Sequence, residues 1–114
     1  MRLHISHTTR YSYNQPVPYG LQQIRLTPKP CDSQAIDNWT ISIEGGREEC
    51  AFNDQHGNRV QLISLDAGQT ETSITCTGVV DTIPTNGVVG LHSGHAPLWY
   101  YKRQTQLTQP GKLI

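Results

Sequence analysis

The sequence predicts an all-β protein, an antiparallel two-sheet β-sandwich of the immunoglobulin-like kind with about six to seven strands. Stretches in which apolar and polar residues alternate recur through the first 81 residues. Turn-forming Gly, Asn, Asp and Pro residues separate these stretches at regular intervals, and no window combines a helical period with capping residues. At 114 residues with 35% hydrophobic content, the chain suits one domain with a thin core between two apolar faces.

The first three predicted strands occupy the N-terminal 44 residues. The opening strand places alternate residues on one face, namely Leu3, Ile5, His7, Thr9, Tyr11 and Tyr13. We expect it to stop before residues 14–20, because two prolines there remove ladder donors. A second strand follows at about 21–27. The third, at about 36–44, presents Trp39, Ile41 and Ile43 on one face.

A polar turn at residues 53–58 joins the fourth predicted strand, 47–52, to the fifth, 59–65. Cys50 and Phe52 alternate before this turn, and Val60 and Leu62 continue the alternation after it, which is typical of a β-hairpin. Gly57 supplies a residue that adopts positive φ without steric cost, and Asp and Asn bond their own backbone.

The sixth predicted strand, 70–81, places Thr72, Ile74, Cys76 and Val80 on one face. Gly78 interrupts it and indicates a bulge or a close contact. After residue 81 the sequence predicts a loop, an aromatic cluster at 98–101 and a polar tail. We therefore expect a sandwich domain over 1–101 and a linker over 102–114.

Composition argues against several classes of partner. The net charge is zero and no basic run occurs, so we expect no nucleic-acid binding. No apolar stretch reaches the length of a membrane span, and the N-terminus lacks the apolar block of a signal peptide, so we expect a cytoplasmic protein without a membrane partner.

The three cysteines do not indicate catalysis. Cys50 and Cys76 fall on apolar registers, where a thiol is usually a small buried hydrophobe, and no helix is predicted whose N-terminus could activate them. Cys31 lies in a proline-flanked loop, where we expect it to be exposed but without a catalytic partner. No Cys-x-x-Cys pair occurs, so reduced thiols are the simplest interpretation.

We also expect no cofactor and no metal. His92 and His95 could share an ion only with a third ligand, which the sequence does not supply nearby. His4 and His7 point to opposite faces of one strand. Glu48 and Glu49 likewise point apart, which removes an acid–base pair. Asp54 and Asn58 offer too few carboxylates for calcium, and no chemical partner is visible for Asp54 or His56.

Trp99, Tyr100 and Tyr101 form the candidate interaction surface, either as a sugar-stacking platform or as a protein contact. The alternative, which we favour at this point, is that Trp99 packs in the core while one tyrosine covers a sheet edge.

The chain resembles the N-terminal region of bacterial transglutaminase-like proteins, cysteine-protease-type proteins of the papain-like transglutaminase superfamily. The resemblance depends on motifs spread over nearly the whole chain rather than on one signature. They are Leu3-x-Ile5, Thr9-x-Tyr11-x-Tyr13, Pro16-Val17, Ile24-Arg25-Leu26-x-Pro28, Trp39-x-Ile41, Asp54-x-x-Gly57-Asn58-x-Val60, Gly78-Val79-Val80 and Arg103-x-Thr105-x-Leu107-Thr108.

This resemblance implies a β-sandwich that precedes a separate catalytic domain with a Cys-His-Asp triad. It implies no catalytic residue in this chain, and it makes Asp54, Gly57 and Asn58 a structural turn of the family. We expect a non-catalytic domain that packs on the catalytic domain or shapes its cleft. The alternative is a stand-alone module that binds a peptide or glycan through the aromatic cluster. Without its partner domain we also expect self-association, through the aromatic end or a strand edge.

Overall fold

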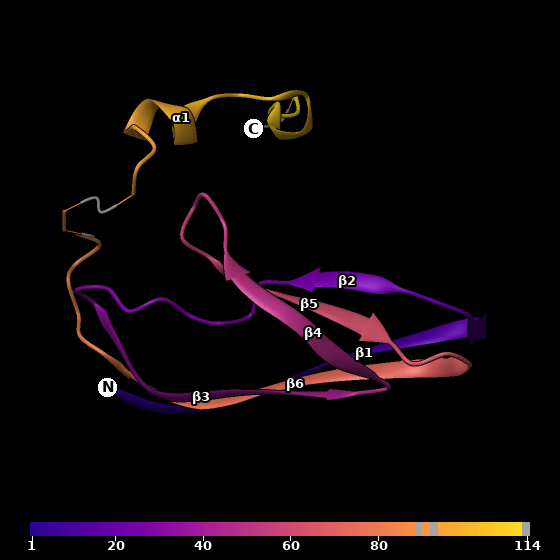
Figure 1. The fold of residues 1–114 in the computed structure, drawn as a ribbon. Helices are drawn as coiled ribbons and strands as arrows, with labels where there is room; N and C mark the ends of the chain where they lie inside the picture. The colour runs from indigo at the N-terminus through magenta and orange to yellow at the C-terminus, as the bar shows by residue number, and fades with distance from the viewer. Residues whose placement is uncertain (89, 92–93, 113–114) are drawn as a thin grey trace.

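Two three-stranded antiparallel sheets pack face to face, which confirms the predicted sandwich. In the computed structural model, which describes residues 1–88, 90–91 and 94–112, we name them after their central strands. The β6 sheet has the order β1-β6-β3, and the β5 sheet has the order β2-β5-β4 (Figure 1). The strands are β1 (Arg2–Val17), β2 (Leu21–Ile24), β3 (Gln34–Glu44), β4 (Gly46–Asn53), β5 (Arg59–Leu65) and β6 (Gln69–Thr82). An α-helix, α1 (Leu98–Lys102), and a 3-10 turn, η1 (Gln106–Thr108), follow.

The core lies between the sheets and is as thin as the composition predicts. Ile24, Ile63 and Ile74 form its centre, and Leu26, Ile41 and Ile43 pack against it. On β6 the predicted inward residues Thr72, Ile74, Cys76 and Val80 are all buried, so that face is confirmed. Because both sheets contribute to the isoleucine cluster, the inward direction of every strand follows from its register.

β1 does not stop before the prolines. It continues through Pro16 to Val17, with a break in register between Ser12 and Val17. Among the described strands β1 pairs with β6 alone, so it is an edge strand, a position at which a proline without a backbone donor is tolerated. β2, in contrast, ends at Ile24, earlier than predicted.

The predicted burial of Cys50 is wrong. Cys50 pairs with Leu62, and Phe52 pairs with Val60, as the alternation indicates. However, this apolar register points away from Ile63 and therefore forms the outer face of the β5 sheet, where Cys50 is exposed. β5 is apolar on both of its faces, so the alternation could not indicate which face would turn inward.

Gly78 is a point of close contact, as predicted. A Cβ atom at this position would collide with the backbone of Asn38 and the ring of Trp39 on the neighbouring strand. The accompanying register shift falls on β3, between Ile36 and Asn38. Glycine therefore allows β3 and β6 to approach each other at the bulge.

The segment after β6 leaves the sandwich. It carries α1 above the tip of the β4–β5 hairpin, on the side of the β5 sheet (Figure 1). The Cα radius of gyration, 17.7 Å, exceeds the roughly 13 Å of a compact domain of this length. The difference reflects this outlying segment, in which none of the described residues is buried.

Candidate interaction surface

The turn between β4 and β5 is organised around the carboxylate of Asp54. Its Oδ1 atom accepts the backbone N–H groups of His56 and Asn58, each at 2.9 Å. Its Oδ2 atom accepts the Asn58 side-chain amide at 3.1 Å and the Arg25 Nε at 3.0 Å. Gly57 has φ +68°, the positive value predicted for this position. The turn is therefore an Asx-type structure locked by one acid.

The pKa of Asp54 lies below its ordinary value of 3.8. Burial acts in the opposite direction, because it disfavours the charged form, and only 8% of the side chain is exposed. The Asn58 N–H, the Arg25 guanidinium and the other donors outweigh that effect by stabilising the carboxylate. The acid thus stays charged to hold the turn, and it is not poised for proton transfer.

The chain that follows β2 runs beside this turn and fixes it from a second side. Arg25 forms the ion pair with Asp54, and Lys29 Nζ donates to the His56 carbonyl at 2.6 Å. Sequence reasoning found no partner for Asp54 or His56, because these contacts join segments 27 or more residues apart. No local pattern reports such a pairing.

Helix α1 lies against the same turn through its aromatic residues. The His56 ring centroid is 5.8 Å from that of Tyr100 and 6.1 Å from that of Tyr101. Trp99 lies edge-on to Tyr100 at 6.4 Å, and the Arg103 guanidinium is 5.5 Å from the Tyr100 centroid. We call this group, namely residues 99–103 with His56 and the Lys29 side chain that contacts it, the turn–helix surface.

Trp99 does not pack in the core, so that expectation is wrong. Its side chain is 66% exposed, and the exposed fractions of Tyr101 and Tyr100 are 52% and 37%. The aromatic cluster instead leaves apolar area open to solvent, and its tyrosines lie against His56. The tyrosines contact the hairpin tip rather than covering a sheet edge.

The two sheets differ in their outer faces. On the β6 sheet that face carries hydroxyl and charged residues such as Ser6, Thr8 and Thr40, with Val79 as an apolar exception. On the β5 sheet five apolar residues, Leu21, Cys50, Phe52, Val60 and Leu62, share that face with the polar residues Gln23, Arg47 and Ser64. Val60 is fully buried, at 0% exposure. Leu21 is 49% exposed and Phe52 is 44% exposed. An outer sheet face of this kind is suited to being covered by another surface.

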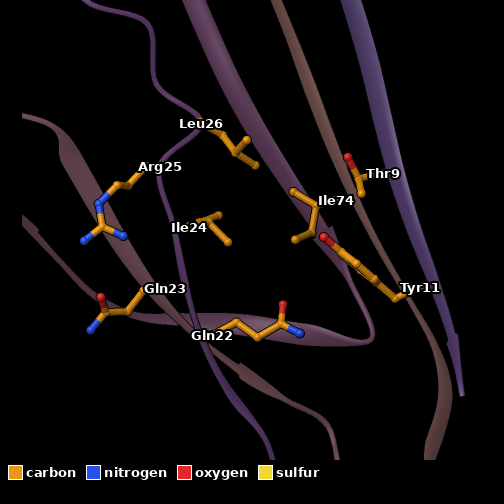
Figure 2. A pocket seen from close by; sticks show the side chains of 8 residues that line it. All are labelled: Thr9, Tyr11, Gln22, Gln23, Ile24, Arg25, Leu26 and Ile74. Carbon is orange, nitrogen blue, oxygen red and sulfur yellow. The ribbon is translucent and has the colours of Figure 1, made fainter. Parts of the chain in front are cut away.

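A cavity of about 480 Å³ opens between the unpaired edges of β1 and β2. Figure 2 shows Ile24 and Leu26 facing Ile74 and Tyr11 across it, whereas Gln23 and Arg25 point away. Its walls belong to the sandwich core, and no pair of acid and base groups lines it. The cavity is the open side of a thin sandwich.

None of the three thiols in the described structure hydrogen-bonds to a histidine. Cys31 is exposed, as expected, and a hydrogen bond with the Ser33 hydroxyl, together with backbone donors, lowers its pKa. Burial raises the pKa of the Cys76 thiol. Among the residues that the structure describes, no cysteine thiol thus has a histidine as its hydrogen-bond partner, which is the arrangement that activates a nucleophilic cysteine.

Within residues 1–88, 90–91 and 94–112, no group of three His, Cys, Asp or Glu side chains is arranged to hold a metal ion. Of the two histidines considered as a possible pair, His92 lies outside the described residues, as does Ser93, so the expectation that His92 and His95 bind no metal is not tested. The same part of the chain contains no helix that is long and apolar enough to span a membrane.

Comparison with known protein families gives one match. Residues 3–81 match the family described as the bacterial transglutaminase-like N-terminal region. The chain belongs to this family. No curated protein and no solved structure matches it.

The match of this transglutaminase-like N-terminal region ends at β6, so it covers the sandwich and the turn at 53–58 but not α1. The family is defined by the N-terminal region of these proteins and not by their catalytic domain. The contact between α1 and His56 is therefore a feature that neither the family match nor the sequence pattern indicated.

Proposed function

We propose that this chain is a non-catalytic accessory domain that packs against the catalytic domain of a transglutaminase-like cysteine protease or amidase and shapes its cleft. The observation that carries the proposal is the pairing of the family match with an exposed apolar surface on one side of the sandwich. That surface combines the outer face of the β5 sheet with Trp99 and its neighbours.

Residues 102–114 act in this proposal as the linker to the catalytic domain. The described part of this segment is exposed, and it runs on the side of the β5 sheet, where the apolar outer face lies (Figure 1). A catalytic domain tethered there reaches this face at a high effective concentration, so modest apolar contacts suffice for docking.

The test measures association between this chain and the catalytic domain of the same protein, produced separately and shown to unfold cooperatively. Phe52→Asp places a charge on the outer face of the β5 sheet and should abolish binding. Thr8→Asp places the same charge on the polar outer face of the β6 sheet and should leave binding unchanged. If the two proteins do not associate, and removal of this region leaves the activity of the full-length protein intact, the proposal is wrong.

The second candidate is a stand-alone module that binds a peptide or glycan. The exposure of Trp99 favours it, because a solvent-facing indole flanked by tyrosines can stack on a sugar ring or an apolar side chain. Tryptophan fluorescence separates the two candidates. If oligosaccharides or peptides shift the emission maximum and the catalytic domain does not, the result would support a binding module. The same result would contradict the role as an accessory domain.

A further inference from the structure

The nine lysines and arginines divide into two groups by their partners. Four of them form ion pairs with carboxylates: Arg2 with Asp37 and Asp81, Arg10 with Glu71, Arg25 with Asp54, and Arg47 with Glu49. In the described structure the remaining five, all resolved, form no ion pair with a carboxylate. They are Lys29, Arg59, Lys102, Arg103 and Lys112.

These five cations lie at the hairpin tip or in the segment after β6. Lys29 donates a hydrogen bond to the His56 carbonyl. Arg59 lies opposite Asn53 in the β4–β5 ladder, at the base of the turn. Lys102 ends α1, Arg103 covers the Tyr100 ring, and Lys112 follows in the tail. The turn itself contains one carboxylate, Asp54, which is neutralised by Arg25 and almost entirely buried.

The carboxylates are distributed in the opposite way. All nine Asp and Glu residues precede residue 82, together with six of the nine Lys and Arg residues, so residues 1–81 carry 6 − 9 = −3. Residues 82–114 contain three Lys or Arg and no acid, and carry +3. A neutral chain thus has a positive end at the turn–helix surface, and its field extends about a Debye length, ~8 Å at physiological salt.

The cations near the aromatic rings are also held in place. The Arg103 guanidinium is positioned by the Tyr100 ring, and the Lys29 ammonium is positioned by a backbone carbonyl, so neither must be ordered again on binding. A guanidinium over an aromatic ring keeps its edge free to receive a carboxylate from outside. The surface therefore offers apolar area at Trp99 and Tyr101 beside preorganised positive charge.

We infer that the turn–helix surface docks onto an acidic patch of the catalytic domain, with carboxylates opposite Lys102, Arg103 and Lys29 and an apolar recess for Trp99. This inference rests on the proposed function and adds the chemistry of the partner surface. Five cations on a chain of zero net charge are too few for the phosphate contacts of nucleic-acid binding, so the observations favour a protein surface.

The experiment measures the dissociation constant of this chain and the separately produced catalytic domain at about 50 mM and about 300 mM NaCl. Lys102→Gln with Arg103→Gln should weaken binding about fivefold at low salt and reduce the salt dependence. The matched control is Arg2→Gln with Arg10→Gln, which removes the same charge from β1 and should leave the dissociation constant unchanged. Lys102 and Arg103 are both exposed and lie outside the core. The variant that carries Lys102→Gln and Arg103→Gln should therefore unfold at the temperature of the original chain.

Charge reversal, Lys102→Glu with Arg103→Glu, gives a second measurement in the full-length protein. It should separate one cooperative thermal transition into two, because the domains become uncoupled. Binding that is insensitive to salt and to both variants would overturn this inference and leave the proposed docking intact. A complete lack of association would overturn the proposed function, and this inference with it.

Discussion

Asp54 is the residue that organises the turn between β4 and β5. Its carboxylate accepts four hydrogen bonds that fix the turn and the chain beside it. The position of His56, and hence of α1, depends on that arrangement. The acid, the histidine and the asparagine of this turn resemble a reactive site in composition, but the geometry assigns them a supporting role.

We predict that Asp54→Asn lowers the thermal midpoint of unfolding at pH 7 by several degrees, because the ion pair with Arg25 and the charge-assisted bonds are lost. The folded-state pKa of Asp54 is depressed, so its contribution to stability is present above the ordinary pKa of 3.8 and is lost as the pH falls below that value. The original chain should therefore lose stability steeply below about pH 4, and Asp54→Asn should lose less.

Thermal melts followed by circular dichroism at a series of pH values check this prediction. Asp66→Asn is a suitable control, because Asp66 lies in another turn and makes no ion pair among the described residues. Equal acid sensitivity of Asp54→Asn and the original chain would show that Asp54 does not hold the turn.

The three cysteines should differ in their reactivity. Cys31 is exposed and its pKa is lowered, so at neutral pH it carries more thiolate than a free cysteine and should react first with iodoacetamide. Cys76 is 3% exposed with a raised pKa and should react only on unfolding. Mass spectrometry of peptides after timed labelling gives the order directly. Early labelling of Cys76 would contradict the buried position assigned to it.

At the scale of elements, α1 is the part that depends most on its contacts. A helix of five residues is far too short to be stable alone, and no side chain caps its N-terminus. It persists because Tyr100 and Tyr101 lie against His56. The contact links the hairpin tip to the cluster that we propose as an interaction surface.

We predict that His56→Ala releases α1 and accelerates tryptic cleavage after Lys102 and Arg103 by about threefold or more, because local opening governs proteolysis. Gln55→Ala, at the exposed neighbour in the same turn, should not change the rate. Cleavage after Lys112, in the tail, serves as an internal standard. An unchanged rate for His56→Ala would mean that the turn does not hold the helix.

The elements also show what sequence patterns can and cannot reveal. The alternation on β1, β3 and β6 predicted the inward faces, because the apolar residues of these strands lie mainly on one face. The faces of β4 and β5 could not be assigned, since Val60 and Leu62 compete with Ile63 and Leu65 for the interior. α1 and its contact with His56 lack any local signal, because a one-turn helix has neither a period nor a cap.

For the molecule as a whole, the important feature is that the outer faces of the two sheets differ in their exposed apolar groups. Leu21, Phe52 and the aromatic residues of α1 remain open to solvent on the side of the β5 sheet, while the outer face of the β6 sheet is polar. A sandwich with such asymmetry has one surface suited to contact and one suited to water.

We predict that this chain, on its own, self-associates reversibly through the aromatic end, because the same apolar area that suits a partner domain also suits a second copy. Sedimentation equilibrium should show an average mass that rises with concentration.

Trp99→Ala should weaken the association about tenfold or more, since a large aromatic anchor is lost. Tyr19 is similarly exposed, at 70% against 66% for Trp99, and precedes β2 near the opposite end of β5. Tyr19→Ala should therefore have no effect. A single monomeric species at millimolar concentration would contradict the prediction. An equal loss with Tyr19→Ala would place the contact elsewhere than at the turn–helix surface.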